Sequence, residues 1–246
     1  MEASTPARKA HLLRYLGSES ETPTAMTFRF STEGSGFTFL SNQAVRIQLS
    51  GVNDPWGSAR LFSLSSSPTE SGWISVTVKM TGSPFKEGLR NLRPGDGVQV
   101  FGPLGDMLYN PGLPAVMIAG GIGISPFRGM IKFALDSGFD EPIVLAYSAR
   151  TPEEFAFRAE LDSIAQRLKN LKVLYTVTRP KESKLSWKGR VGRIDEQFIR
   201  EAAAGLENPN FYVAGLPEMV ESTLGILQSR LGLPEERLWW EPFRGY

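Results

Sequence analysis

Two short stretches of this sequence hold the residue types that could bind a ligand. In the first, "RLFS", an arginine, an aromatic ring and a hydroxyl occur within four residues as Arg60, Phe62 and Ser63. A strand that only packs would alternate apolar and polar residues. Here an arginine can pair with a diphosphate, a ring can lie against a flat heterocycle, and a hydroxyl can donate a hydrogen bond. The stretch predicts a ligand-binding strand, with a serine-rich edge strand as the alternative.

A polar loop, "TGSPFKEGL", follows this strand in the sequence. Ser83 and Lys86 can interact with an anion, and Pro84 marks the start of a helix. Short period-two segments surround both the strand and the loop, so we expect them to lie on one β-barrel. An arginine–aromatic–serine strand combined with an anion-binding loop is suited to a flavin dinucleotide.

The second stretch, "VMIAGGIGISPFRGMI", is typical of a strand, a glycine loop and a helix. Gly120, Gly121 and Gly123 let the backbone turn sharply and leave room for a phosphate. We expect Ser125 to be the N-cap of the helix and Pro126 its first residue, so that the helix N-terminus faces a pyrophosphate. The motif is not G-x-G-x-x-G, and a role in the turn alone stays open.

Polar and basic residues end the next two expected strands. Ser148 and Arg150 belong to "YSART", and Arg179 belongs to "TVTRP". Ligands of open α/β sheets bind beyond the carboxyl ends of the strands. Arg150 and Arg179 are therefore predicted to hold the adenosine 2′-phosphate of NADPH, with solvated loop arginines as the alternative.

The elements that position these residues differ between the two halves of the chain. Residues 26–101 contain the period-two segments "MTFRFS", "AVRIQLS", "WISVTVKM" and "GVQVFG", which predict an antiparallel sandwich or barrel. From residue 114, the apolar runs "PAVMIAG", "PIVLAYS", "KVLYTVT" and "NFYVAG" alternate with helical patterns. That alternation predicts a parallel sheet built from βαβ units. We expect two domains, residues 1–112 and 113–246.

The composition narrows the possible chemistry. The chain has 246 residues, a formal net charge of +1, no cysteine and one histidine, His11. Without cysteine there are no disulfides, thiolate nucleophiles or cysteine-held iron–sulfur clusters, so redox chemistry would need an organic cofactor. The balanced charge shows no basic stripe for nucleic acid, and no metal site is expected. His11 is expected to face solvent. No signal peptide or membrane-spanning run is found, which predicts a cytoplasmic protein.

The order of these motifs resembles the ferredoxin–NADP reductase superfamily in its single-flavin form, without a fused iron–sulfur domain. "RLFS" resembles the family's Arg-x-Tyr-Ser flavin motif, and "SPFKEGL" and "RPGDGVQVFGPLGDM" resemble its phosphate-binding loop and closing strand. "AGGIGISPF", "FYVAGLPEMV" and "WWEPFRGY" resemble its nucleotide loop, its Cys-Gly-x-x-x-Met segment and its C-terminal tail. The resemblance begins near residue 25. It implies an N-terminal antiparallel Greek-key flavin-binding β-barrel followed by a Rossmann-like parallel α/β nucleotide-binding domain.

The resemblance implies roles at the matched positions. Arg60 would hold the FAD pyrophosphate, and Ser63 would hydrogen-bond flavin N5, the atom that receives hydride. Glu241 would lie near the nicotinamide, and Tyr246 would stack on the flavin face where the nicotinamide arrives. Ser63, Glu241 and Tyr246 are the catalytic candidates. The cofactor-binding candidates are Arg60, Leu61, Phe62, Ser63, Val78, Lys79, Gly82, Ser83, Phe85, Lys86, Gly120, Gly121, Gly123, Ile124, Ser125, Ser148, Arg150, Arg179, Gly215, Leu216, Pro217, Met219 and Tyr246.

The sequence departs from the family pattern at three places. Phe62 replaces the family's tyrosine, Ala214 replaces its cysteine, and "LSNQ" replaces its Pro-Gly-Gln turn. Because Ala214 has no thiol to contact the nicotinamide, this change bears on the rate of hydride transfer. Flavin supplies the redox chemistry in this family, so transfer itself is not excluded.

The resemblance implies an FAD-dependent oxidoreductase that uses NADPH or NADH. Hydride would pass to FAD, and electrons would then leave to a separate redox carrier protein such as a ferredoxin, a flavodoxin or an oxygenase component. Two alternatives are a direct reductase of free flavin, quinone or ferric chelate, and a flavin-binding regulatory or sensor subunit with little turnover. The arginines favour NADPH, and the oligomeric state is not readable from the sequence.

Overall fold

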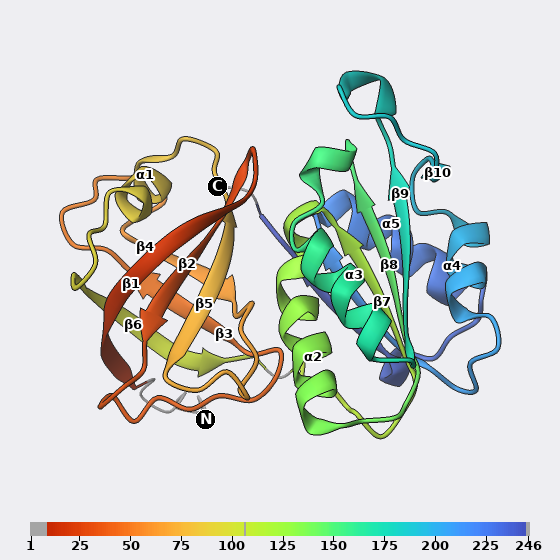
Figure 1. Ribbon diagram of the computed structural model, residues 1–246, viewed down its shortest axis with the longest axis horizontal. Coiled ribbons are helices and arrows are strands. Elements are labelled where there is room, and N and C mark those ends of the chain that lie inside the picture. Colours follow the sequence, from red (N-terminus) through yellow and green to blue (C-terminus); the bar gives the residue numbers. More distant parts are fainter. Residues whose placement is uncertain (1–8, 106, 245–246) are drawn as a thin grey trace, which may run out of the picture.

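The computed structural model describes residues 9–105 and 107–244, which form two sheets side by side (Figure 1). The first sheet is antiparallel, in the order β4-β3-β6-β1-β2-β5. A bridge between Leu64 and Val76 joins its two edges, which closes the sheet into a barrel. Its strands are β1 (Ala10–Thr22), β2 (Ala25–Ser31), β3 (Ala44–Gln48), β4 (Ala59–Ser63), β5 (Trp73–Lys79) and β6 (Gly97–Leu104).

The barrel interior is filled by every second residue along its strands, the residues that face inward. Phe28 and Phe30 on β2 are fully buried, as are Ile74 and Val76 on β5. Helix α1 (Pro84–Arg90) adds two apolar side chains to the same core. Ser83 is its N-cap and accepts a hydrogen bond from the Lys86 N–H at 3.4 Å. The short helix is thereby fixed to the barrel, and it places the polar loop before it near β4 and β5.

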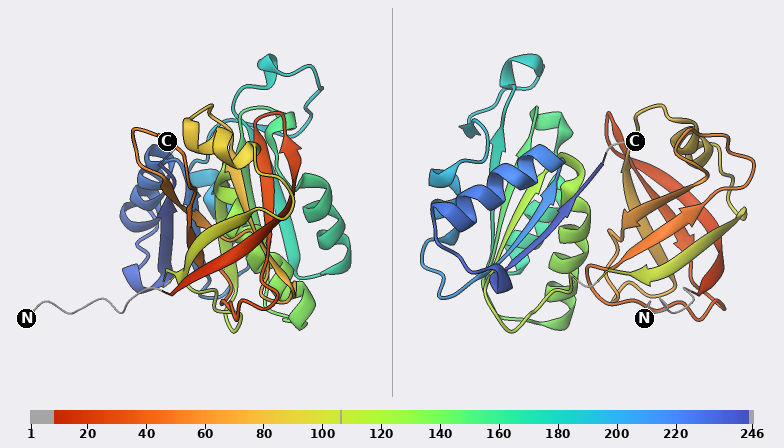
Figure 2. Two further views of the ribbon diagram at one scale, coloured as in Figure 1. Left: turned by 90° about the vertical axis from the view of Figure 1, so that its left-hand side faces the viewer. Right: turned by 180° about the vertical axis from the view of Figure 1, so that it is seen from behind.

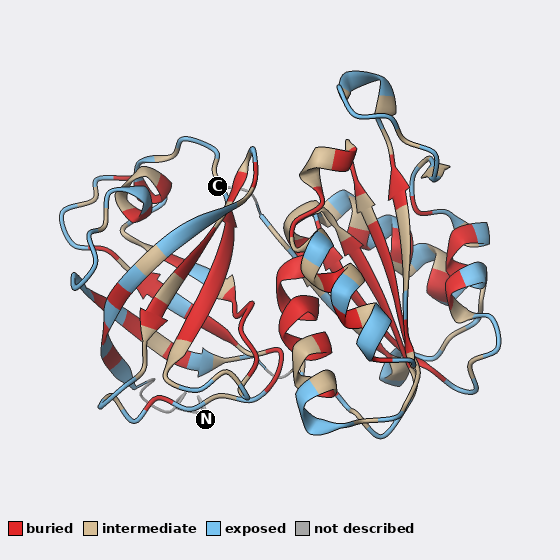
Figure 3. Ribbon diagram, in the orientation of Figure 1, coloured by how far each residue is buried: buried red, intermediate tan, exposed pale blue. Residues whose placement is uncertain are grey.

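The second sheet is parallel, in the order β10-β9-β8-β7-β11-β12. Its central strands are buried almost without interruption (Figure 3), as expected for a sheet that is covered on both faces. Its strands are β7 (Ala115–Gly120), β8 (Ile143–Ala149), β9 (Leu171–Val177), β10 (Arg190–Val191), β11 (Asn210–Gly215) and β12 (Leu238–Pro242). The sequence-based expectation of an antiparallel barrel followed by a parallel α/β half is confirmed.

Two layers of helices cover the parallel sheet. Helix α2 (Ile124–Ser137) and α3 (Arg158–Arg167) pack on one face, and α4 (Glu196–Ala203) and α5 (Pro217–Ser229) pack on the other. Figure 2 shows that α2 is the helix next to the barrel. Single 3₁₀ turns are η1 (Gly121–Gly123), η2 (Pro152–Glu154), η3 (Pro180–Glu182) and η4 (Glu235–Arg237).

The connection between the two halves contains the expected domain boundary. Strand β6 ends at Leu104 and β7 begins at Ala115, so the boundary after residue 112 falls in the linking segment. A division into independently folding units stays a prediction. No helix within residues 9–105 and 107–244 is both long and apolar enough to cross a membrane.

The N-terminal strand corrects one expectation. His11 was expected to face solvent, but it lies on β1 and is only 7% exposed. Its ring meets the edge of Phe37, with ring centres 5.1 Å apart, and its Nδ1 lies 3.2 Å from the Ser35 carbonyl. The error arises because the exposed face of β1 carries Leu12 and Leu16, so residue polarity does not show which face is buried, and the partner segment of His11 is distant in the sequence.

Candidate functional site

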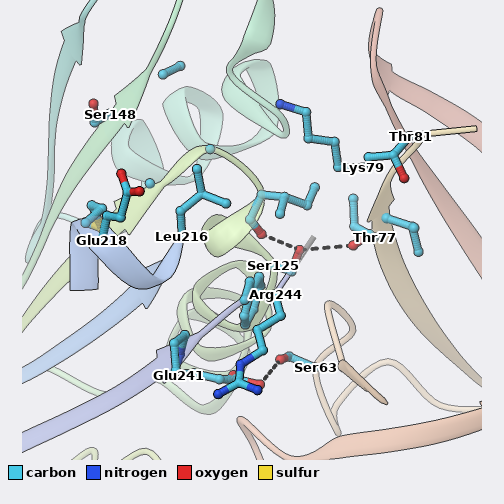
Figure 4. A pocket seen from close by; sticks show the side chains of 18 of the residues that line it. Ser63, Thr77, Lys79, Thr81, Ser125, Ser148, Leu216, Glu218, Glu241 and Arg244 are labelled. Atoms are coloured by element: carbon cyan, nitrogen blue, oxygen red, sulfur yellow. Dashed lines mark hydrogen bonds between the residues drawn. The ribbon is translucent and has the colours of Figure 1, made fainter. Parts of the chain in front are cut away.

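A cleft of about 820 Å³ lies between the barrel and the carboxyl ends of the parallel strands (Figure 4). Its barrel wall comes from β4, β5 and the following loop, and its other wall comes from the first loops of the α/β half. This is where ligands bind in open α/β sheets. The cleft brings together many of the residues singled out in the sequence: Arg60, Leu61, Phe62, Ser63, Val78, Lys79, Lys86, Gly120, Gly121, Ser125, Ser148, Arg150, Leu216, Met219 and Glu241.

A hydrogen bond joins the two walls of the cleft. The Ser63 hydroxyl donates to Glu241 Oε1 at 2.6 Å (Figure 4). Glu241 reaches this position because β12 pairs in parallel with β11, with Glu241 opposite Ala214, and runs toward the barrel (Figure 2). Burial raises the pKa of Glu241, and the bond from Ser63 opposes that rise only in part. The bond gives a carboxyl group with an elevated pKa a fixed partner on the barrel.

The barrel wall has an aromatic part next to Ser63. The Phe62 ring lines the cleft and lies 6.1 Å, centre to centre, from the buried ring of Phe85. Leu61, on the same strand, is 59% exposed and also lines the cleft. This wall offers apolar surface on which a flat ring can lie.

The far end of the barrel wall is cationic. Arg60 is buried, donates to the carbonyls of Trp56 and Gly57 at 2.8 Å each, and forms an ion pair with Asp54 at 2.5 Å. Asp54 also accepts the Phe85 N–H at 3.0 Å. One carboxylate therefore holds Arg60 and the start of α1 together, and nothing in the local sequence singled out Asp54 for this role.

Lys86 is the second buried cation of that end. Its Nζ donates to Thr81 Oγ1 at 3.1 Å, and the residue is 5% exposed. Burial, together with the positive charges of Arg60 and Lys79, lowers the pKa of Lys86 to about 8. Three basic side chains on one cleft wall are suited to the two negative charges of a diphosphate.

The glycine loop forms the opposing wall. Gly120 and Gly121 line the cleft, and Gly121 has a φ of +54°, which favours glycine. Gly123 faces away from the cleft: a Cβ there would lie 2.1 Å from the Ala214 carbonyl oxygen. Glycine is required at position 123 because the loop packs directly onto the backbone of β11.

This packing corrects the expected helix start. Helix α2 begins at Ile124 after η1, with Gly123 as its N-cap, and Pro126 is its third residue. The expectation that Ser125 caps the helix is wrong. The Ser125 hydroxyl donates back to the Ile122 carbonyl at 2.8 Å, while the side chain lines the cleft.

The arginines that were expected to bind an adenosine phosphate are separated by the structure. Arg150 lines the cleft next to Ser148 and pairs with Glu154 at 3.2 Å. Arg179 does not line it and pairs with Glu182 at 3.3 Å. Arg193 lines the cleft instead.

Several other candidates also lie away from the cleft surface. Phe85 has its ring in the barrel core and its N–H bonded to Asp54, so it presents no donor to the cleft. Ala214 is fully buried and does not line the cleft. Tyr246 lies outside the described residues. The remaining candidates outside the cleft lining are Gly82, Ser83, Ile124, Gly215 and Pro217.

Residues that the sequence did not single out complete the lining. Trp56 is 68% exposed at the cleft, Thr77 and Thr81 come from the barrel, and Glu218 and Thr223 come from α5. Thr81 and Glu218 lie within "TGSPFKEGL" and "FYVAGLPEMV" but were not named there as candidates, whereas Trp56 and Thr223 lie outside every quoted stretch. Together, the aromatic part, the basic end and the glycine loop fit two dinucleotides, one on each wall.

Comparison with known proteins agrees with this arrangement. Residues 117–224 match the family model of the oxidoreductase NAD-binding domain. Ferredoxin–NADP reductase B of Sorangium cellulosum is 28% identical over 220 residues, covering 86% of this chain and 88% of that protein. Over most of its length the chain is similar to proteins of the ferredoxin–NADP reductase superfamily. It is accordingly an FAD-dependent NAD(P)H oxidoreductase.

Other members of the superfamily extend the likeness. The gamma subunit of sulfhydrogenase 1 from Pyrococcus furiosus is 28% identical, covering 85% of this chain and 70% of that protein. The fold is shared with the cytochrome P450 reductase of Amycolatopsis, with a TM-score of 0.82, 21% identity and coverage of 97% and 71%. It is also shared with the cytochrome b5 reductase domain of Ulva prolifera nitrate reductase, with a TM-score of 0.79, 22% identity and coverage of 96% and 97%.

Proposed function

We propose that this protein takes hydride from NADPH and passes electrons to a separate redox carrier protein. The observation that carries the proposal is the Ser63–Glu241 hydrogen bond, which joins the flavin wall to the nucleotide wall at one point of the cleft. FAD, when bound, would supply the chemistry of accepting a hydride and releasing electrons singly. The chain would supply binding, orientation and a polar pair at the reacting centre.

The roles of the barrel residues follow from their places in the cleft. Phe62 would support one face of a ring, and Arg60 and Lys86 would hold the diphosphate. The Ser63 hydroxyl proton lies on its bond to Glu241 in the structure, so this proton is available to a hydrogen-bond acceptor that displaces the carboxylate. Glu241 would keep Ser63 oriented until that acceptor arrives, and would exclude water from that side.

The preference for NADPH rests on the arginines at the strand ends. Arg150 and Arg193 both line the cleft beyond β8 and β10, where an adenosine phosphate would lie. Each hydrogen bond from a charged group to a phosphate contributes about 1.5–3 kcal/mol, which is enough for two arginines to select NADPH. Arg179 would contribute less, because it pairs with Glu182 outside the cleft lining.

The acceptor is proposed to be a ferredoxin, a flavodoxin or an oxygenase component. Support comes from relatives: the glycine betaine monooxygenase reductase subunit of Pseudomonas aeruginosa is 26% identical, covering 91% of this chain and 62% of that protein. A ferredoxin reductase of carbazole 1,9a-dioxygenase has the same fold, with a TM-score of 0.77. The stacking of Tyr246 on the flavin face and a cytoplasmic location stay predictions.

The first test is the visible spectrum of the purified protein, recorded before and after anaerobic addition of NADPH and then NADH. We expect a yellow protein whose flavin band bleaches within seconds, and faster with NADPH. A yellow protein that stays oxidised would favour the sensor alternative and point to Ala214. A colourless protein that FAD cannot reconstitute would refute the proposal.

A second test separates the acceptor classes and the role of the polar pair. Turnover should be supported by one-electron carrier proteins, and turnover with small acceptors alone would favour the direct reductase. Ser63→Ala and Glu241→Gln should slow anaerobic flavin reduction by about 10²–10³-fold and about tenfold respectively, with FAD still bound. Unchanged reduction rates in both variants would remove the pair from the reaction.

A further inference from the structure

The serine-rich segment 64–70, which follows β4, does not face the cleft. Ser65, Ser66 and Ser67 are at most 1% exposed, and none of them lines the cleft. The Ser65 hydroxyl bonds to Ser75 Oγ at 2.8 Å, and the Ser66 hydroxyl accepts the Ser75 N–H at 3.0 Å. These hydroxyls attach the segment to β5, and they leave its backbone and Glu70 facing the α/β half.

Arg128 on α2 reaches across to this segment. Its guanidinium donates to the Ser65 carbonyl at 3.2 Å and makes two bonds to the carboxylate of Glu70. Its other edge makes two bonds to Glu160 on α3, at 2.6 and 3.0 Å. The Arg128 side chain is only 10% exposed. Burial works against its charge, yet the bonds to Glu160 and Glu70 raise the pKa of Arg128, so it stays charged.

The backbones of the two halves also meet at this place. A Cβ on Gly129 would lie 2.7 Å from the Ser66 carbonyl oxygen, so α2 touches the segment without a side chain between them. Farther along α2, Thr69 Oγ1 donates to Asp136 at 2.5 Å. At the start of α2, Ser125 Oγ lies 3.4 Å from the Thr77 carbonyl. One face of α2 therefore forms the seam between the halves over most of its length.

This seam connects both walls of the cleft over very short chain lengths. Ser63, on the flavin wall, directly precedes the segment 64–70. On the nucleotide wall, the glycine loop ends at Gly123, about one and a half helical turns before Arg128. Any rotation of α2 against the segment would thus shift the glycine loop relative to Ser63 and Phe62.

We propose that Arg128 is a positioning residue, which fixes the nucleotide wall against the flavin wall at the distance that hydride transfer needs. The inference rests on the proposed function for its kinetic consequence only. Two carboxylates on separate halves, Glu70 and Glu160, share one planar guanidinium, which makes two hydrogen bonds to each. The ammonium group of a lysine cannot make both pairs of bonds. Loss of Arg128 weakens the contact between α2 and the segment 64–70, and it changes none of the residues that line the two walls of the cleft.

The kinetic test compares Arg128→Met with Arg128→Lys and with the control Arg237→Met. Arg237 also bonds to carbonyl and amide groups, but within the α/β half alone. In anaerobic stopped-flow experiments, Arg128→Met should lower the limiting rate of flavin reduction by about 10²-fold, as expected for a misplacement near 1 Å. FAD content and the Kd of NADPH should change less than twofold, and Arg128→Lys should lie in between. An equal loss of rate in Arg237→Met would show a merely structural effect and overturn the proposal.

A distance measurement tests the seam without turnover. The chain has no cysteine, so spin labels can be attached at Ser18→Cys on the barrel and Lys169→Cys on the α/β half, both exposed positions. Pulsed electron resonance should give one narrow distance distribution in the parent chain and in Arg237→Met, and a broad one in Arg128→Met. Glu160→Gln, which keeps the Glu70 pair, should broaden it less.

A narrow, unchanged distribution in Arg128→Met would overturn the proposal. Because this readout needs no electron transfer, it is independent of the proposed function. If the parent chain takes no electrons from NADPH, the proposed function is refuted. If Arg128→Met then still shows the broadened distribution, the positioning role of Arg128 stands.

Discussion

Lys86 shows how the surroundings of one side chain set its charge. It is buried at the basic end of the cleft, and burial together with Arg60 and Lys79 lowers its pKa to about 8. A lysine with a pKa below its ordinary value binds its proton less tightly in the folded chain than in the unfolded one. Stability therefore rises with pH between about 8 and the ordinary lysine pKa near 10.4. The same titration removes a positive charge from the proposed diphosphate site.

We expect FAD binding to weaken as pH rises through 8. Loss of the Lys86 proton should raise the Kd of FAD by up to about tenfold per pH unit above pH 8. Fluorescence titration of the cofactor-free protein at pH 7, 8 and 9 measures this. Lys86→Arg stays charged and should show no such slope, whereas Lys86→Met should bind weakly at all three pH values. A slope that persists in Lys86→Arg would assign the titration to another group.

Single glycines have different tasks within the elements of this fold. Gly123 ends the glycine loop where it lies against the backbone of Ala214. Gly225 lies in the middle of α5, is exposed, and has open space where a Cβ would be. The first glycine is needed for a close approach between two elements. The second only weakens its helix, because glycine loses more backbone entropy than alanine on folding.

Alanine at these two glycines should have opposite effects on the free energy of unfolding. Gly123→Ala should lower it by about 1–3 kcal/mol, as for an overpacked core site, because the new methyl group meets backbone that cannot swing away. Gly225→Ala should raise it by about 0.5–1 kcal/mol. Urea unfolding followed by circular dichroism measures both. Equal stability of the two variants would refute the packing role assigned to Gly123.

The whole molecule is held as one unit by contacts on both sides of the cleft. Ser63 and Glu241 connect the halves at the cleft, and Arg128 with Glu70 and Glu160 connects them along α2. The barrel and the α/β half each have a hydrophobic core, and we predict that this buried ion-pair cluster couples the unfolding of the two. Ligand binding to one half should therefore stabilise both.

Calorimetry can test this coupling. In the parent chain, FAD at 100 times its Kd should shift a single unfolding transition upward by about 5–10 °C, since it adds about 2.7 kcal/mol. In Arg128→Met we expect two transitions, of which only the barrel transition shifts with FAD. Arg237→Met should keep a single transition at lower temperature. Two transitions in the parent chain would show that the halves are not coupled.

The sequence by itself determined the two kinds of sheet and the short motifs of the cleft. Strand type follows from local periodicity, which is why β2, β3, β5, β7 and β8 lie where the patterns predict them. Arg60, Phe62 and Ser63 could be proposed together because they are contiguous on one strand. The glycine loop could be proposed because strand, loop and helix follow one another in the chain.

The tertiary structure alone decided which of these residues meet across the fold. Glu241 reaches Ser63 because β12 adds to the sheet beside β11, and Arg128 meets Glu70 because α2 packs on the barrel. His11 and Ser125 were misassigned for the same reason: their surroundings come from segments that local pattern does not contain. Long-range contacts depend on how whole elements pack. No property of neighbouring residues encodes them, and the seam between the halves became visible only in three dimensions.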